Sequence, residues 1–391
     1  MHTRWKILAV STGVQLCAAL GTQSIGAWGV FAQQRFVLSH AQLGLLATLC
    51  SAITIPGLWL AGCALDRHGE RWPVTTGICI LAAAMALLGL ADSYAACLAA
   101  MALLGLGYSP IQPGGSRVIH SWFPPAQRGL AMGIRQAALP LGGALAAVLF
   151  PALIGAQGWM GAMGNAALLM VLAGGAFAWV HRPAPIAAPY AASPPGPTGH
   201  RTSLPTVVGA LLVLGQTAIS VYWGLFMAQA FALPLATATG LLFQAQLAGA
   251  VGRIVLARVS DRHPGQRWIS VSGCAVACAA VMACAALLPA SVPLGCLVTL
   301  SGAAGFFGFG WYGPWVVWLT ESARARQTGR ALGAAMAMNQ VSIALLPLAF
   351  GWSVDQVGGY RPAWWTLAAS AALAGLVCGW AGRTTQSVTR P

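Results

Sequence analysis

The sequence has 391 residues, of which 58% are hydrophobic and 7% are charged, and its mean hydropathy is +0.73. A water-soluble chain of this length cannot bury so much apolar surface, so the composition excludes an ordinary globular protein. The formal net charge of +14 would suggest a nucleic-acid partner in a soluble protein. Here the basic residues lie in short segments between apolar runs, so we expect no nucleic acid.

The apolar runs predict the fold class. About twelve runs of roughly 18–20 apolar residues occur along the chain, each long enough to cross a bilayer as a helix. Inside lipid only helices and closed barrels satisfy the backbone, and the alternation of a barrel strand is absent from these runs. We therefore predict an all-α membrane protein with twelve transmembrane helices and the lipid bilayer as its surroundings, and we expect a monomer.

Arginine and lysine residues gather in alternate loops, while Arg35 and Arg361 lie in loops of the other side. This bias places both termini in the cytoplasm and the chain in the inner membrane, because basic loops stay on the cytoplasmic side. The short basic lead up to Lys6 enters a run too long for a signal peptide, so no cleaved segment is expected.

The first predicted helix runs from about Ile7 to Gln33 and ends in Trp28-Gly29-Val30-Phe31. The same pattern recurs as Trp223-Gly224-Leu225-Phe226 in the seventh predicted helix. Aromatic residues at these places either line a cavity or anchor the helix at the membrane interface. Both interpretations stay open, and Trp28 is a candidate for the lining of a substrate site.

A charged turn follows the second predicted helix and occurs twice. The segment Asp66-Arg67-His68-Gly69-Glu70-Arg71-Trp72 has its counterpart in residues 261–268, where Asp-Arg-His and a later Arg-Trp pair are repeated. Such repetition indicates that one half of the chain is a structural copy of the other.

This turn resembles the loop between the second and third helices of the major facilitator superfamily. Its pattern Gly-x-x-x-Asp-Arg-x-Gly-x-Arg is matched by Gly62, Asp66, Arg67, Gly69 and Arg71. The second copy keeps Asp261 and Arg262, but has Ala257 for the first glycine and an inserted Pro264. The resemblance implies a transporter of two pseudo-symmetric six-helix bundles, in which these residues form a conformational latch. The expected bundles are residues 1–181 and 204–391, with a cytoplasmic linker at 182–203 and a short cytoplasmic tail.

The fourth and tenth predicted helices are interrupted at matching places by Gly-Tyr-Ser-Pro around Tyr108 and by Gly-Trp-Tyr-Gly-Pro around Tyr312. Interrupted helices in corresponding positions of two halves mark the transport path, so both tyrosines are site candidates. Arg117 follows in the fourth helix, either as a further anion-binding residue or as a partner of the charged turn. His120 is either an interfacial residue or a carrier of protons.

The fifth predicted helix holds a charge deep in an apolar run. Arg128 marks its edge, and Arg135 lies about 10 Å deeper at 1.5 Å per residue. A charge at such depth indicates a functional site, although an arginine can also snorkel to the interface. Gln136, the next residue, is a candidate partner in substrate binding.

The eighth predicted helix carries Arg253, which precedes Asp261 by eight residues and so lies about 12 Å inward. Its position resembles that of the anion-binding arginine in monocarboxylate and oxalate–formate type transporters. Gly249 stands where some of those relatives have an acid or amide, which argues against proton coupling there. In the eleventh helix, Asn339 occupies the place that matches Arg135, and Gln340 follows it as a second candidate.

These residues predict the function. The six acidic residues all fall in or near loops, so a cavity between the two deep arginines would attract an anion. We expect Arg135 and Arg253 to face one another and bind a small mono- or dicarboxylate, moved by alternating access through anion exchange or proton-linked symport. The alternative is a multidrug or antibiotic efflux transporter; a carrier of neutral solutes and a membrane sensor are further readings.

Enzymes are disfavoured because the sequence has no catalytic triad, phosphate-binding loop or metal-binding cluster. The ten cysteines lie mostly within apolar runs, as expected for small packing residues. We therefore predict no metal, no cofactor and no catalytic residue.

Overall fold

The structure is a computed structural model that describes residues 2–123, 125–182, 202–260, 262, 266–289, 291–322 and 328–389. It divides into two compact units, Met1–Tyr190 (unit 1) and Ala191–Pro391 (unit 2), each described here by itself. Regular structure in the described segments is helical throughout, so the prediction of an all-α membrane protein is confirmed. Most of the linker expected at 182–203 lies outside the described residues.

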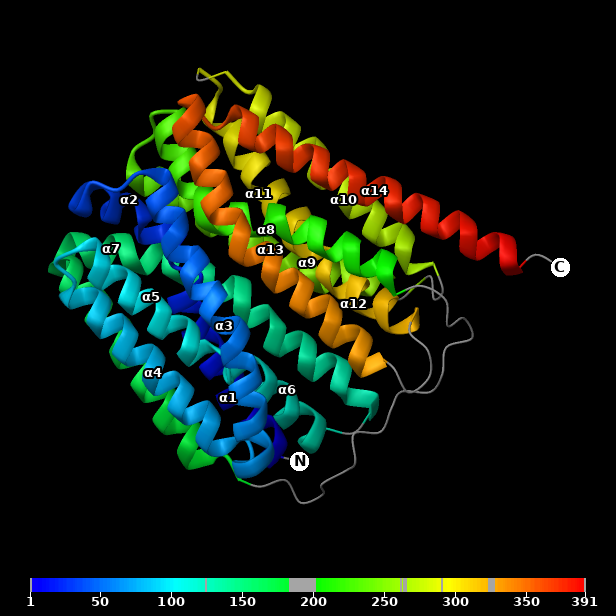
Figure 1. Cartoon of the computed structure of the whole chain (residues 1–391), viewed down its shortest axis with the longest axis horizontal. Coiled ribbons are helices and arrows are strands. Elements are labelled where there is room, and N and C mark those ends of the chain that lie inside the picture. The colour runs from blue at the N-terminus through cyan, green and yellow to red at the C-terminus, as the bar shows by residue number, and fades with distance from the viewer. Residues whose placement is uncertain are drawn as a thin grey trace. The chain divides into compact units, whose positions relative to one another are not determined.

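The described residues of unit 1 form seven helical segments. They are α1 (His2–Thr22), α2 (Ile25–Phe36), α3 (His40–His68), α4 (Arg71–Leu90), α5 (Tyr94–Tyr108), α6 (Ile111–Trp122) and α7 (Pro125–Val180). In Figure 1, α3, α4 and α5 run side by side, coloured blue to cyan.

The part of unit 2 that the structure describes also forms seven helical segments. They are α8 (Ser203–Ala230), α9 (Leu235–Ser260), α10 (Arg267–Leu287), α11 (Leu294–Gly310), α12 (Tyr312–Glu321), α13 (Thr328–Val357) and α14 (Arg361–Thr389). The segments α10 and α14 pack along one another, as Figure 1 shows.

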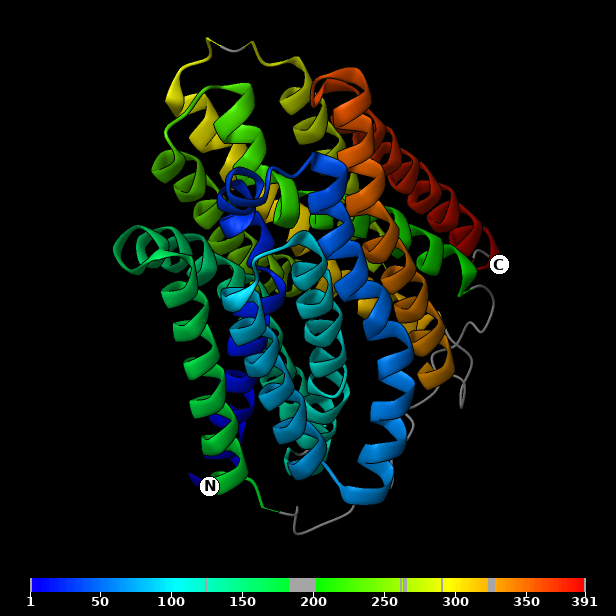
Figure 2. The same ribbon diagram turned by 60° about the vertical axis from the view of Figure 1, so that its left-hand side comes forward.

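Within the described residues, ten segments are long and apolar enough to cross a membrane. One of them, Ala131–Val180, has 50 residues and would be about 75 Å long if straight, more than twice the thickness of a bilayer core. It contains two helices joined at Gly158, whose φ of +73° lies in the left-handed region that glycine tolerates. Figure 2 shows the chain reversing direction along α7. With α1 and α2 as a broken first span, the described residues account for the twelve predicted spans.

The predicted interruptions are present in both units. In unit 1, α5 ends at Tyr108 and α6 begins at Ile111, and in unit 2, α11 ends at Gly310 and α12 begins at Tyr312. Each break places a tyrosine at the junction of two short helices. The residues between the helices, Ser109, Pro110 and Trp311, keep right-handed helical φ and ψ values, so each break is a local interruption of a continuous span.

Glycine allows helices to touch backbone to backbone at matching positions of the two units. A Cβ atom at Gly105 of α5 would overlap the carbonyl oxygen of Cys50 in α3, and one at Gly305 of α11 would overlap that of Ala245 in α9. Small residues at such crossings are typical of membrane helices, which gain stability from close packing rather than from hydrophobic burial.

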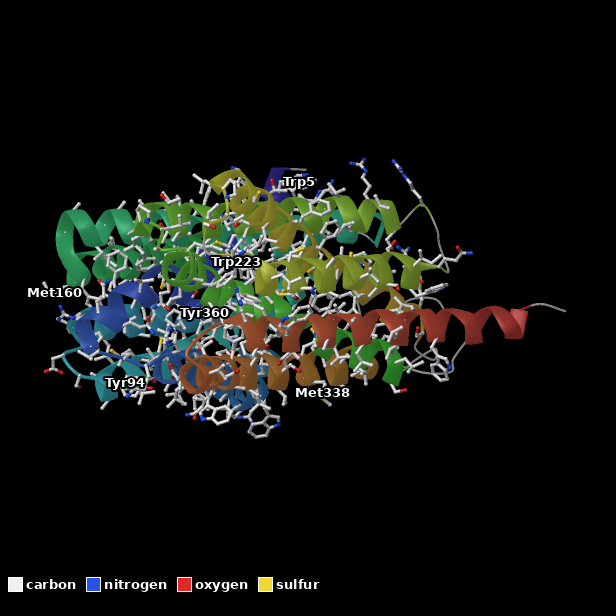
Figure 3. All side chains as sticks on the ribbon, turned by 90° about the horizontal axis from the view of Figure 1, so that it is seen from above. Trp5, Tyr94, Met160, Trp223, Met338 and Tyr360 are labelled. Atoms are coloured by element: carbon white, nitrogen blue, oxygen red, sulfur yellow. The ribbon has the colours of Figure 1, made fainter. Side chains whose placement is uncertain are left out.

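Aromatic rings form the packing of unit 2 between α8, α13 and α14. Trp223 and Tyr360, both labelled in Figure 3, belong to this cluster. The ring centroids of Phe226 and Tyr360 lie 5.3 Å apart in a tilted arrangement, and those of Trp223 and Trp364 lie 5.4 Å apart, edge to face. The tryptophan pattern at the end of the seventh predicted helix thus serves packing in this half.

Candidate functional site

Arg135 lies at the centre of a polar cluster in unit 1. Its side chain is 0% exposed. The Nη2 atom donates hydrogen bonds to Oε1 of Gln15 in α1 and to the carbonyl oxygen of Ile111 in α6, both at 2.7 Å. The Nη1 atom donates to Oε1 of Gln112 at 3.2 Å. The cluster therefore joins α1, α6 and α7 through one guanidinium group.

The break between α5 and α6 makes room for this guanidinium. A Cβ atom at Gly115 of α6 would overlap the Nε, Cζ and Nη2 atoms of Arg135, so only glycine lets the group lie against the helix. Tyr108, at the end of α5, accepts a 3.5 Å hydrogen bond from Nε2 of Gln15. The predicted site residues Arg135 and Tyr108 thus share the partner Gln15.

The surroundings of Arg135 do not fit snorkelling, because its donors point to oxygen atoms inside unit 1. All of its hydrogen-bond acceptors among the described residues are neutral amide or carbonyl oxygens. A buried guanidinium held in this way keeps its full positive charge, and burying it without a carboxylate is energetically costly. Such an arrangement attracts an anion.

Arg253 in unit 2 has a different setting. It is 9% exposed and belongs to α9, and its Cζ atom lies 5.0 Å from the ring centroid of Tyr312 at the start of α12. The Tyr312 hydroxyl lies 3.9 Å from Sδ of Met336 in α13. The aromatic ring holds part of the charge by a cation–π contact, so Arg253, Tyr312 and α13 form one connected group.

Asn339 lies one turn along α13 from Met336. It is 5% exposed, whereas its neighbour Met338, labelled in Figure 3, is 49% exposed and points away from the buried face. Among the described residues, Oδ1 of Asn339 has no hydrogen-bond partner. Gln340 and Gln136 are half-buried beside Asn339 and Arg135. The structure therefore associates Asn339 with the Arg253 group through α13.

Trp28 is not among the contacts of Arg135. Its Nε1 atom donates to Oγ of Ser24 at 2.8 Å, and its ring packs at 5.6 Å against Trp159, next to the turn at Gly158. It is 1% exposed. The structure thus places Trp28 in the packing between α2 and α7, and its role in substrate binding stays a prediction.

The charged turn of unit 1 is held by an acid that the sequence analysis did not single out. Glu70 forms an ion pair with Nε of Arg117 at 3.0 Å, and Nη1 of Arg117 donates to the Leu65 carbonyl at 3.3 Å. His181, stacked on Phe177, lies 3.8 Å from the other Glu70 oxygen. The His181 hydrogen bond, assisted by Arg117, lowers the pKa of the Glu70 carboxyl. Arg117 therefore pairs with the charged turn.

The remaining latch residues lie around this ion pair. Gly69 ends α3 with a φ of +67°, and Arg71 begins α4 with its guanidinium 5.3 Å from the ring centroid of Trp72. Gly62 faces open space, and Arg67 and Arg262 are exposed. Asp261 lies outside the described residues, as do the side chains of Asp66, His120 and Arg128.

In unit 2 an ion pair joins the corresponding helices, but the positions of the acid and the base are exchanged. Arg267, the first residue of α10, donates from Nε to Oε1 of Glu321 at the end of α12 at 2.8 Å. Its Nη1 atom lies 3.4 Å from Oγ of Ser260 in α9. In unit 1 the acid precedes α4 and the base lies on α6, so the charges have changed places between the units.

The sequence analysis missed Gln15, Gln112, Glu70 and His181. A glutamine inside the first apolar run and another beside the helix break were the available signals, because buried amides need partners. The structure shows no group of three His, Cys, Asp or Glu residues fit for a metal in the part of the chain that it describes.

The described residues form twelve membrane spans, with interrupted helices at matching places and two buried arginine side chains, which is the architecture of a membrane transporter. Comparison with known proteins gives its family. The sequence matches the Major Facilitator Superfamily over residues 12–347 and 206–391. The chain belongs to this superfamily, and it is therefore a multi-pass membrane transporter and not an enzyme.

Individual relatives agree with this assignment. An uncharacterized MFS-type transporter of Mycobacterium tuberculosis is 30% identical over 380 residues, which cover 92% of this chain and 81% of the relative. The hexuronate transporter of Bacillus subtilis is 27% identical over 129 residues, 33% of this chain and 31% of that protein. The crystal structure of a bacterial homolog of the human lysosomal transporter Spinster has a TM-score of 0.80 at 16% identity and covers 98% of both chains, which shows the shared fold.

Proposed function

We propose that this transporter moves an organic anion that carries a carboxylate. The observation that carries the proposal is Arg135, a fully buried guanidinium whose described hydrogen-bond acceptors are all neutral. A charge placed at this depth without a carboxylate partner is expensive, and such residues generally serve transport or ligand binding. A carboxylate is the natural complement, because it matches the planar fork of an arginine.

The placement of the acidic residues supports an anionic substrate. In the described helices the acids lie at or near helix ends: Asp66 in the last turn of α3, Glu70 before α4, Asp92 after α4, Glu321 at the end of α12 and Asp355 in the last turn of α13. An exporter of cationic drugs would be expected to hold a carboxylate near the middle of a span. The substrate site proposed here has positive charge instead.

Arg253 is the proposed second contact for the anion. Its position in the eighth span resembles the arginine of monocarboxylate and oxalate–formate type transporters, and the match to a hexuronate transporter supports a carboxylate substrate. We assign Asn339, Tyr312, Gln340, Gln136 and Tyr108 to the neutral part of the site, where hydrogen bonds would orient the substrate.

The proposed mechanism is alternating access, in which two halves rock about a central site. We propose that both termini lie in the cytoplasm. We also propose that the charged turns control the exchange between the inward-facing and outward-facing states. With no acid in the middle of a described span, we propose anion exchange, or symport in which the substrate itself carries the proton.

The test is a ligand-stability screen on detergent-purified protein, because a ligand that binds the folded state raises the melting temperature. The panel contains carboxylates of increasing length, neutral sugars and organic cations. Carboxylates should raise the melting temperature, and the best of them should show counterflow in liposomes without a pH gradient. Stabilisation by organic cations alone would overturn the proposal and favour the efflux alternative.

A further inference from the structure

Gln246 is a buried amide that the fold does not satisfy. Its side chain is 0% exposed in α9, and neither Oε1 nor Nε2 has a hydrogen-bond partner among the residues that the structure describes. Leaving both ends of an amide unpaired is costly, and buried polar groups in native proteins almost always have a partner. The partner of Gln246 is therefore to be sought outside the described residues.

Other glutamines show that the fold can satisfy such groups where it needs to. Gln244, two residues earlier on α9, donates from Nε2 to the Val298 carbonyl of α11 at 3.1 Å. Gln15 uses both ends of its amide, accepting from Arg135 and donating to Tyr108. Gln246 is different because its two hydrogen-bonding atoms are buried without such contacts.

Gln246 lies on the same face of α9 as Arg253. Seven residues separate them, which is close to two helical turns and about 10 Å along the axis. Between them on this face α9 presents the small residues Gly249 and Ala250, both buried, and the side chain of Phe309 in α11 packs against Gly249. The opposite face, which includes Leu247, Val251 and Ile254, is exposed. Gln246 and Arg253 are thus two polar side chains on the buried face of α9.

We propose that Gln246 forms a hydrogen bond with a hydroxyl group of the transported acid while Arg253 binds its carboxylate. An amide both accepts and donates, as a hydroxyl does, so one hydroxyl can satisfy either end of Gln246. The two backbone positions lie about 10 Å apart along the helix axis, which favours an extended, hydroxylated carboxylate over the shortest acids. This inference rests on the proposed function and narrows it, because an acid without hydroxyl groups would leave the amide unpaired.

The experiment compares gluconate with hexanoate, two acids of equal carbon number that differ in their hydroxyl groups. Binding of each is measured on purified full-length protein for the wild type, for Gln246→Met and for the control Gln244→Met. Methionine is similar in length and shape to glutamine but forms no comparable hydrogen bond. The wild type should prefer gluconate. In Gln246→Met the preference should fall about tenfold or more, through weaker gluconate binding, while hexanoate binding is kept.

The control and a second variant make the outcomes separable. Gln244→Met should leave the ratio of the two affinities within about twofold of wild type. If Gln246→Met does not fold, Gln246→Asn keeps an amide but withdraws it by one methylene, and the ratio should fall in the same direction. An unchanged ratio in a folded Gln246 variant that still binds both acids overturns this inference and leaves the proposed function standing. A wild type that binds no carboxylate overturns the proposed function itself.

Discussion

Arg135 of unit 1 and Arg253 of unit 2 are both buried arginines within membrane spans, but their surroundings differ. Arg135 is held by amide and carbonyl oxygens of α1 and α6, at distances down to 2.7 Å. Arg253 packs its guanidinium at 5.0 Å from the ring centroid of Tyr312. Oxygen acceptors fix the direction of each N–H group, whereas a ring attracts the charge without using up a hydrogen-bond direction.

The ion pairs near the charged turns also differ between the two units. Glu70 with Arg117 in unit 1 and Arg267 with Glu321 in unit 2 tie corresponding helices, yet acid and base have exchanged places. The two halves thus preserve the kind of contact and its location, while the residues that make it have changed. A repeated fold requires that the helices be tied at these points and does not require a particular order of charges.

The different surroundings give Arg135 a structural role in addition to its proposed part in binding the anion. Arg135 completes the polar interior of unit 1, so its loss should reduce stability as well as transport. Arg253 should act mainly on the substrate. Three variants test this difference, and a fourth test concerns the ion pairs.

The largest effect is expected for Arg135→Met. The substitution leaves the buried oxygens of Gln15 and Ile111 without their donor, which should reduce the free energy of unfolding by about 2–5 kcal/mol. Thermal melting in detergent measures the loss. Arg253→Met, which removes the cation–π contact with Tyr312 among other interactions, is the comparison. Equal melting temperatures for the two variants would show that the oxygen shell of Arg135 adds no stability.

Arg253→Lys should weaken carboxylate binding about ten- to a hundredfold, or 1.5–3 kcal/mol, while the melting temperature stays near that of wild type. Lysine keeps the charge and loses the planar fork, so a two-point contact with a carboxylate is lost. Ligand-induced shifts in melting and counterflow both report the change. Arg258→Lys, at an exposed position of the same helix, is the control. Full transport by Arg253→Lys would count against a bidentate contact.

Gly115→Ala tests whether the position of Arg135 matters beyond its charge. The added methyl group overlaps the guanidinium, so the arginine must leave its acceptors or α6 must move, at a cost of about 1–3 kcal/mol. We expect a lower melting temperature and slower transport. Gly133→Ala is the matched control, because a Cβ there meets nothing within 4 Å. If both variants behave like wild type, the close contact with Gly115 is not required.

The smallest effect concerns the ion pair of Glu70. The pKa of its carboxyl is lowered from 4.5, so its contribution to stability is present above pH 4.5 and is lost as the pH falls through the lower, folded-state value. Arg117 is 44% exposed, and screening by water limits the contribution to about 0.5–1 kcal/mol.

Glu70→Gln should therefore melt slightly below wild type at pH 7, and the difference should shrink as the pH falls below 4.5 and vanish once the folded-state carboxyl is protonated. Glu321→Gln at pH 7 tests whether the reversed pair of unit 2 also contributes to stability. A gap between Glu70→Gln and wild type that persists in acid would mean that the carboxylate charge is not its cause.

The sequence predicted the spans, the repeat and the two helix breaks, because hydropathy, Gly and Pro act over short stretches of chain. It also indicated Arg135 and Arg253, since a charge in an apolar run is visible by itself. The partners of Arg135 were not predictable in this way: Gln15 lies 120 residues away along the chain. Glu70 was within the recognised turn, but its pairing with Arg117 depends on how α4 and α6 pack, which no local pattern records.

The contacts of Gly105 with the Cys50 carbonyl and of Gly305 with the Ala245 carbonyl have a mechanical consequence. Two helices that touch along their backbones have no layer of side chains between them that can rearrange to let them slide. We therefore expect α3 with α5, and α9 with α11, to move as two rigid helix pairs, with bending confined to the breaks after Tyr108 and Gly310. Backbone amide exchange should stay slow along both helix pairs when substrate is added, and faster exchange there would contradict this expectation. Substrate binding would then cause rotation of whole helix pairs.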